Sequence, residues 1–201
     1  MDQLLRGMRV ATLVADGFEQ SELTVPREAL QREGAAVVIV APHPGVVQAT
    51  DRGVAAGRFQ VGLTVNELQA EDFDGVLLPG GAASAHELGE RPEVRLFLQS
   101  LQREGKPVAA IAHGVGVLAA ADAVEGRRLA GAPQCRQALR AAGGEWVEGD
   151  LAVDENWVSA RDLAVPGPFI EQMLLAFVQP PRGWINAAAL GGMAERAEGR
   201  V

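Results

Sequence analysis

The segment that decides the fold reads KPVAAIAHGVGVL, residues Lys106 to Leu118. Small and apolar residues fill positions 108–112, the pair His113-Gly114 interrupts them, and good helix formers resume at Val115. This pattern predicts a buried strand, a tight turn and a helix. Such an elbow lifts one side chain above the sheet edge, beside the free N–H groups of the helix. The turn residue is Ala112 or His113, and the most raised position holds alanine, which has no chemistry.

Strands and helices alternate on the N-terminal side of this segment. Apolar runs at 9–14 and 35–41 predict two buried strands, joined by a helix over 19–33 through a right-handed crossover. Residues 43–66 carry turn signals and predict a hairpin excursion. A strand follows at 75–78 and a helix at 92–104. The sequence LQREG occurs at 30–34 and again at 101–105, so we expect the same helix-to-strand junction twice.

The alternation continues beyond the elbow helix, and it defines the fold class. The pattern predicts a three-layer α/β/α sandwich, flavodoxin-like, on a mainly parallel sheet with a nucleophile-elbow strand-turn-helix. One domain is expected over 1–179, followed by a C-terminal tail over 180–201 that we interpret as a frayed terminus, or alternatively as a dimer arm anchored by Trp184. The remaining elements are expected as a helix at 134–142, strands at 145–147, 151–153 and 157–159, and a helix at 168–178.

Composition excludes several classes of function. The 201 residues are 48% hydrophobic, enough for one substantial core, and the net charge of -8 argues against nucleic-acid binding. No apolar run reaches the length of a membrane span and no signal peptide is recognisable, so we expect a cytoplasmic protein without a membrane partner. The single cysteine, Cys135, and the widely spaced histidines leave no metal cluster, and no cofactor is expected.

A dinucleotide fingerprint is only partly matched at the elbow. The glycines of Gly114-Val115-Gly116 follow a predicted strand, but no acidic residue lies about 20 positions further on to hold a ribose. Nucleotide binding is therefore not expected. In a parallel sheet, ligands bind beyond the carboxyl ends of the strands, which gathers loops 16–22, 79–81 and 112–114 in one crevice.

These three loops resemble the PfpI intracellular-protease family of the class I glutamine-amidotransferase-like superfamily, which includes the parkinsonism-associated deglycase. The matching pieces are ADGFEQSEL at 15–23, DGVLLPGG at 74–81, GKPVAAI with His113-Gly114 at 105–114, and GEWV with NWVS at 144–159. The resemblance implies a cysteine nucleophile at the position of Ala112, followed by His113. It also implies Glu22 as hydrogen-bond partner of the thiol, Glu19 as a second acid, and an oxyanion site at Gly80 and Gly81.

Alanine at position 112 cannot form an acyl-enzyme or a hemithioacetal. Either the chain carries an engineered Cys-to-Ala replacement, or the natural protein has lost its nucleophile. Other family positions have also lost polar groups: residues 130–133 read AGAP where the family often has Thr-Ser-Tyr-Pro, and Ala85 stands where an acid often pairs with the histidine, although Glu87 is near. Because one mutagenesis step would not remove so many polar groups, natural loss is favoured.

Two functional hypotheses follow. The first is a stress-related PfpI-family protein without cysteine catalysis that binds a small carbonyl or peptide ligand, or a partner, and self-associates as a homodimer or larger assembly. In the alternative, the protein is an active hydrolase, as intracellular peptidase, deglycase or glyoxalase, through His113 and Glu22 or through a cysteine removed by design. On the first hypothesis His113 has no catalytic role and hydrogen-bonds locally, a buried Glu22 is protonated or bound to water, and Cys135 is an ordinary helix residue.

Overall fold

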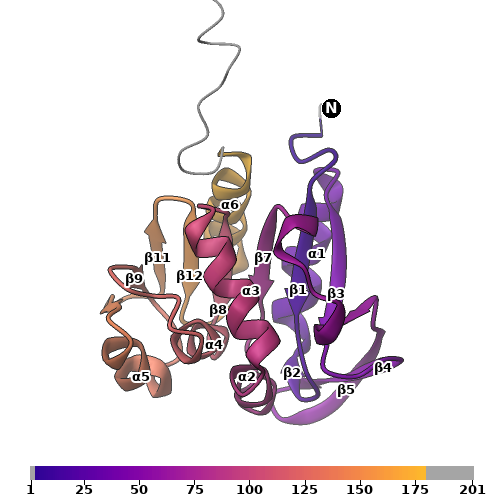
Figure 1. Cartoon of the computed structure of the whole chain (residues 1–201), viewed down its shortest axis with the longest axis horizontal. Helices are drawn as coiled ribbons and strands as arrows, with labels where there is room; N and C mark the ends of the chain where they lie inside the picture. The colour runs from indigo at the N-terminus through magenta and orange to yellow at the C-terminus, as the bar shows by residue number, and fades with distance from the viewer. Residues whose placement is uncertain (1–2, 180–201) are drawn as a thin grey trace, which may run out of the picture.

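The computed structural model describes residues 3–179, and these form one α/β domain (Figure 1). Twelve strands are assigned in this range: β1 Arg9–Leu13, β2 Phe18–Glu19, β3 Ala36–Ala41, β4 Val46–Asp51, β5 Val54–Gln60, β6 Leu63–Thr64, β7 Gly75–Leu78, β8 Val108–Ile111, β9 Arg128–Leu129, β10 Glu145–Trp146, β11 Leu151–Asp154 and β12 Trp157–Ala160. The six α-helices are α1 Gln20–Arg32, α2 Ala82–Gly89, α3 Pro92–Arg103, α4 Gly114–Ala120, α5 Arg136–Ala141 and α6 Pro166–Val178. Short 3₁₀ turns occur at Val65–Glu67, Ala70–Asp72 and Pro133–Cys135.

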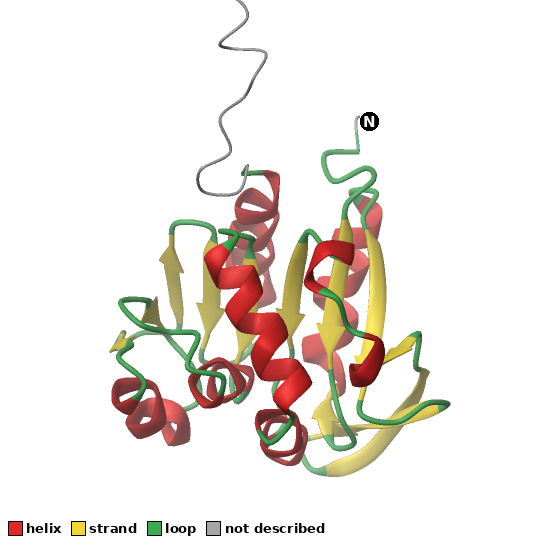
Figure 2. Ribbon diagram, viewed as in Figure 1, coloured by secondary structure: helices red, strands yellow, loops and turns green. Residues whose placement is uncertain are grey.

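The main sheet has seven strands in the order β11-β12-β8-β7-β1-β3-β6. All neighbouring pairs are parallel except β11 with β12. Helices α1 and α6 cover one face, and α3 with α4 covers the other, so the sheet lies between two helical layers (Figure 2). The predicted three-layer, mainly parallel architecture is confirmed.

The central strands are apolar because both of their faces are covered. Every residue of β7 and of β8 is buried, as are Val10 to Leu13 of β1. One hydrophobic cluster joins this sheet to α3 and α4 through residues such as Phe97 and Leu118, and a second joins it to α6 through Phe169 and Met173. These two layers of apolar contact fix the carboxyl ends of β1, β7 and β8 relative to one another.

The repeated LQREG segments end α1 and α3 in the same way. Gly34 and Gly105 both have left-handed backbone, with φ of 91° and 64°. The N–H of Ala35 bonds the carbonyl of Leu30, and that of Lys106 bonds the carbonyl of Leu101. The prediction of one junction used twice is confirmed, because each helix needs a residue that tolerates positive φ before the chain turns into a strand.

Several sequence expectations need correction. Helix α2 was not predicted, and α1 runs from Gln20 to Arg32 with Pro26 in its interior. The last helix begins at Pro166, two residues before the expected start. The tail at 180–201, with Trp184, lies outside the described residues.

The hairpin predicted within 43–66 is present as β4 and β5, which pair antiparallel. It belongs to a second sheet of order β2-β4-β5, because β2 pairs parallel with β4. In Figure 1 this small sheet lies beside the lower ends of β1 and β3, the edge at which the parallel strands end. The hairpin is thereby placed next to the crevice where ligands are expected.

Candidate functional site

The elbow between β8 and α4 has the strained conformation that such turns impose. Ala112 has φ 50°, and only four of the described non-glycine residues have positive φ. Its N–H bonds the carbonyl of Ala160 at 2.8 Å, and its own carbonyl accepts the N–H of Ala132 at 3.1 Å. The alanine side chain makes no polar contact that could offset this strain. The hydrogen bonds of the neighbouring main chain hold the residue in a region that L-residues rarely adopt. The expectation of a raised, strained residue at position 112 is confirmed.

The residue after His113 must be glycine. A Cβ built on Gly114 would overlap the carbonyl oxygen of Leu78, at the end of the neighbouring strand β7. The helix α4 therefore packs its first turn directly against the main chain of β7. This close approach brings loops 79–81 and 112–114 together, as predicted from the parallel sheet.

Glu22 lies beside the elbow and lines the pocket, where Gly80 separates its carboxyl group from Ala112. It belongs to the first turn of α1 and is buried, and its Oε2 accepts the N–H of Gly80 at 2.7 Å. A Cβ on Gly80 would collide with this carboxyl group and approach Ala112 Cβ within 2.9 Å. Burial raises the pKa of Glu22 to about 7, and the charges of Glu19 and Asp162 act in the same direction against the Gly80 hydrogen bond. The carboxyl group is therefore about half protonated at neutral pH.

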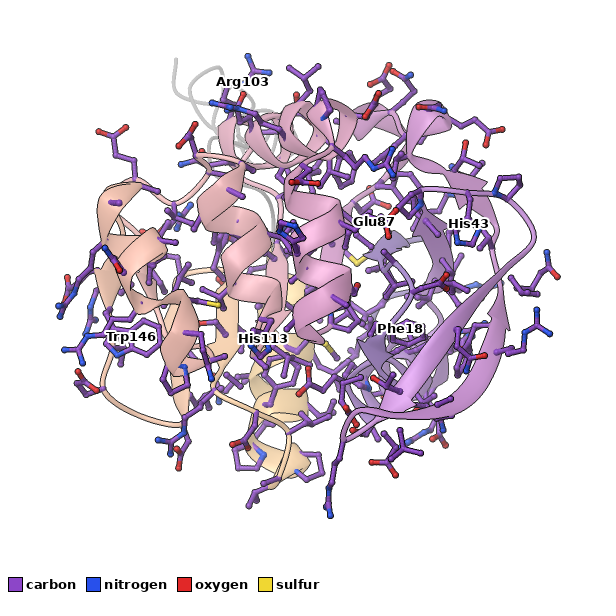
Figure 3. All side chains as sticks on the ribbon, turned by 90° about the horizontal axis from the view of Figure 1, so that it is seen from below. Phe18, His43, Glu87, Arg103, His113 and Trp146 are labelled. Carbon is purple, nitrogen blue, oxygen red and sulfur yellow. The ribbon has the colours of Figure 1, made fainter. Side chains whose placement is uncertain are left out.

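A pocket of about 820 Å³ opens over these groups. The sequence-predicted residues Glu19, Glu22, Gly81, Ala112 and His113 all line it, and Gly80 lies directly beneath. Figure 3 looks onto this edge of the sheet, with His113 near its centre. The other lining residues are Gly17, Ser21, Thr50, Arg52, Gly53, Ala82, Ala83, Ala132, Pro133, Arg161, Asp162, Leu163 and Ala164.

Gly81 supplies the pocket with a backbone donor. It precedes α2 with φ 103°, and a Cβ there would overlap the carbonyl of Gly17. No described residue accepts a hydrogen bond from its N–H. A free N–H at the start of a helix suits an oxygen atom that carries negative charge. The predicted oxyanion position therefore has the geometry that this role requires.

The His113 imidazole is half-buried and lowered in pKa by that burial. The side chain makes no hydrogen bond or ion pair to a residue in the described range. The expectation that it hydrogen-bonds locally is therefore wrong: the ring lines the pocket and keeps both nitrogen atoms for a ligand or water.

Glu19 lines the pocket, as expected, and its carboxyl group also binds the β4–β5 hairpin. Its Oε2 accepts the N–H of Arg52 at 3.1 Å, at the tip of the β4–β5 hairpin. The second acid of the first loop thus holds the rim of the pocket. From the sequence, Asp51-Arg52-Gly53 was predicted only as one of the turns within 43–66. No local pattern predicted that this turn would lie at the pocket. Sequence reasoning also missed Arg161 and Asp162, which follow β12 and line the pocket.

Cys135 lies outside the pocket lining, but it belongs to a 3₁₀ turn and not to the α-helix that was predicted from position 134. It ends a 3₁₀ turn before α5, and its buried Sγ lies 4.0 Å from the carbonyl oxygen of Ala112. Burial raises the thiol pKa, although the N–H of Gly116 donates to the sulfur and opposes this. Cys135 is absent from the pocket lining, so it packs behind the elbow.

No group of three or more His, Cys, Asp or Glu side chains within residues 3–179 could hold a metal ion. No helix within this range is long and apolar enough to cross a membrane.

The fold and site define a three-layer α/β protein with an elbow pocket of the amidotransferase-like type. The chain matches the family model described as "DJ-1/PfpI family" over residues 8–175. It is 37% identical over 164 residues to a deglycase of Pyrococcus abyssi, covering 80% of this chain and 92% of the relative. The chain belongs to the DJ-1/PfpI family, as the sequence resemblance implied.

Two solved structures share the fold. A cysteine-to-alanine mutant of a DJ-1 superfamily protein from Salmonella typhimurium is 26% identical with a TM-score of 0.68, over 95% of this chain and 96% of that one. A protein of Anabaena variabilis with DJ-1/ThiJ/PfpI-like and ferritin-like domains is 27% identical with a TM-score of 0.76. The match covers 84% of this chain but only 47% of that two-domain protein.

Proposed function

We propose that this DJ-1/PfpI-family protein binds small carbonyl compounds or peptide ends in the elbow pocket and performs no cysteine-dependent catalysis. The observation that carries the proposal is the methyl group of Ala112 at a fully formed elbow. The left-handed backbone, the Glu22–Gly80 hydrogen bond and the free Gly81 N–H surround a side chain that cannot attack a carbonyl. The pocket can therefore bind and orient such a ligand without forming a covalent bond to it.

The rest of the chain offers no substitute thiol. Cys135 is buried behind the elbow, its pKa is raised, and it does not line the pocket. A thiol in that setting is a poor nucleophile, because the thiolate is the reactive form. The neutral form of Glu22 can instead donate a hydrogen bond to a ligand oxygen, while Gly81 donates from the other loop. By analogy with its family we assign the protein to a stress response in the cytoplasm, as a homodimer.

The second candidate is an active enzyme of the same family, a peptidase, deglycase or glyoxalase. The relatives named deglycases favour it, as does a carboxyl group with a pKa of about 7 in the pocket, which suits general acid–base chemistry. The nucleophile would then have been removed by design, or His113 and Glu22 would act without one. The solved Salmonella relative is itself a cysteine-to-alanine mutant, so such replacements are made in this family.

The test compares methylglyoxal consumption and peptidase activity of the unmodified chain with those of Ala112→Cys. Ala164→Cys is the matched control, because Ala164 lines the same pocket from the loop after β12, away from the elbow. The control and Ala112→Cys have the same arginines and one added cysteine each, so their non-enzymatic reactions with methylglyoxal are matched. We expect turnover in Ala112→Cys alone. Multiple turnovers by the unmodified chain, above the protein-free blank, would contradict the proposal, and a cysteine codon at position 112 of the natural gene would establish removal by design.

A further inference from the structure

The tip of the β4–β5 hairpin breaks a local rule of turn chemistry. Asp51 pairs with Val54, so Arg52 and Gly53 form a two-residue loop. Their φ values are 50° and 82°, the pair of positive angles that a type I′ turn requires. Gly, Asn or Asp normally occupies the first position, because Gly has no Cβ to crowd the following carbonyl oxygen and the side chains of Asn and Asp can hydrogen-bond locally. Residues that break such rules concentrate at functional sites, and Arg52 lines the pocket.

Side-chain hydrogen bonds join this hairpin to β2 and to the first turn of α1, which carries Glu22. Glu19 Oε2 accepts the Arg52 N–H at 3.1 Å, and Gln20 Oε1 accepts the Gly57 N–H at 2.6 Å. The Thr50 hydroxyl lies 3.2 Å from the Gly17 carbonyl and 3.1 Å from the Phe18 carbonyl. The backbone of Arg52 is therefore fixed relative to the pocket floor, although its side chain is exposed.

The guanidinium of Arg52 has no partner among the described residues. The other arginine of the pocket, Arg161, forms an ion pair with Asp150. The carboxyl groups that line the pocket bind backbone N–H groups instead: Glu22 that of Gly80, Glu19 that of Arg52 itself, and Asp162 that of Ala164. One cationic group at the pocket rim is thus left for a ligand.

We propose that Arg52 is the anion-binding residue of the pocket, and that the ligands are small carbonyl compounds that also carry a carboxylate, such as 2-oxo acids. The planar guanidinium binds the carboxylate through two parallel N–H···O bonds. The carbonyl oxygen is left for the pocket floor, where the Gly81 N–H is free. This inference rests on the proposed function for the carbonyl end of the ligand, and on Arg52 alone for the anionic end.

The experiment measures dissociation constants by NMR titration of the full chain with pyruvate, acetate and hydroxyacetone. Pyruvate has both groups, acetate only the carboxylate, and hydroxyacetone only the carbonyl. The decisive variant is Arg52→Asn, because asparagine suits the turn better than arginine while it removes the charge. Arg52→Lys keeps a charge without the planar fork. Arg58→Asn is the matched control, since Arg58 is an exposed residue of the same hairpin outside the pocket lining.

We expect Arg52→Asn to weaken pyruvate and acetate binding about tenfold, the value of one charge-assisted contact. Its thermal midpoint should rise, hydroxyacetone binding should stay unchanged, and Arg58→Asn should bind all three probes like the unmodified chain. Arg52→Lys should fall between the two. Loss of anion binding in a protein with a more stable turn cannot be attributed to misfolding.

Three outcomes overturn the inference: anion binding that survives in Arg52→Asn, equal weakening of all three probes, or no binding of pyruvate and acetate to the unmodified chain. If hydroxyacetone still binds in the last case, the proposed function stands without the anion site. If the two carboxylates bind through Arg52 while hydroxyacetone does not, the anion site stands and carbonyl binding fails.

Discussion

Glu22 links the pocket to the stability of the fold through its protonation. The carboxyl group is buried, and its pKa rises from 4.5 to about 7 on folding. Between these two values the unfolded chain has lost the proton while the native protein retains it. The stabilisation from this group is therefore complete below pH 4.5 and is lost as pH rises through 7.

The Glu22→Gln variant tests this linkage. Glutamine is neutral at every pH, and its side-chain oxygen can still accept the Gly80 N–H. We expect the two proteins to be about equally stable at pH 4.5 and the variant to be more stable at pH 8, by roughly 3 kcal/mol for the shift in pKa. Urea unfolding at both values measures the difference. The depressed pKa of His113 acts in the opposite sense below pH 6.5, but it cancels in the comparison.

A variant whose stability advantage is the same at both pH values would show that folding does not raise the pKa of Glu22. The carboxyl group would then be ionised in the native pocket and would act as an acceptor only. Such a result would remove its proposed role as a hydrogen-bond donor to a carbonyl ligand.

Individual residues differ in how well the sequence predicted them. Glu22, His113 and Gly81 were placed in one pocket from the order of strand ends, because a parallel sheet brings those loops together. The partners of their side chains were not predictable. Glu19 bonds a backbone N–H 33 residues away, and Cys135 packs behind an elbow 23 residues before it. Contacts of this kind depend on tertiary packing and leave no local pattern.

At the scale of elements, strands buried on both faces and helices with a clear apolar stripe were the easiest to predict. The strand at Gly75–Leu78 was predicted to the residue. Helix α2 was missed because only Ser84 and Leu88 of its eight residues are buried. Its position depends on a tertiary contact, the hydrogen bond from the Ala15 N–H to the Ser84 hydroxyl at 2.9 Å.

The close packing of β7 against α4 predicts that alanine at Gly114 will destabilise the protein far more than alanine at Gly167. In Gly114→Ala the new methyl group would overlap the Leu78 carbonyl, so β7 and the elbow helix must separate. We expect a loss of more than about 3 kcal/mol, as for other overpacked or strained core sites. In Gly167→Ala, in the first turn of α6, the methyl group meets nothing within 4 Å outside the neighbouring residues, and we expect stability to change by less than about 1 kcal/mol, because the helix propensity of alanine is opposed by its position before Pro168.

Chemical denaturation of both glycine variants gives the comparison. Equal stabilities would mean that α4 can move away from β7 at little cost, in which case the elbow is a soft element and the strain at Ala112 is not imposed by packing. A Gly114→Ala protein that does not fold, beside a stable Gly167→Ala protein, agrees with the expected contrast.

At the scale of the whole molecule, α6 covers one face of the sheet and leaves part of its own surface uncovered. Met173 is fully buried in the cluster between α6 and the sheet, whereas Leu175, two residues further on, is 53% exposed. Val178 on the same helix is 47% exposed. A single chain gives the exposed residues little reason to be apolar, but a homodimer that covers them would.

The two truncations in α6 separate the core from a possible interface. Met173→Ala should lose about 2–5 kcal/mol at any protein concentration, because it leaves a cavity inside the chain. In a monomer, Leu175→Ala should change stability by less than about 0.5 kcal/mol. If the homodimer forms through this face, Leu175→Ala should instead lower the thermal midpoint more at high than at low concentration, because association stabilises the folded state by mass action.

Thermal unfolding over a hundredfold dilution, with sedimentation equilibrium on the same samples, distinguishes these cases. A dimer that is unaffected by Leu175→Ala would place the interface on another surface, and a concentration-independent monomer would contradict the proposed self-association.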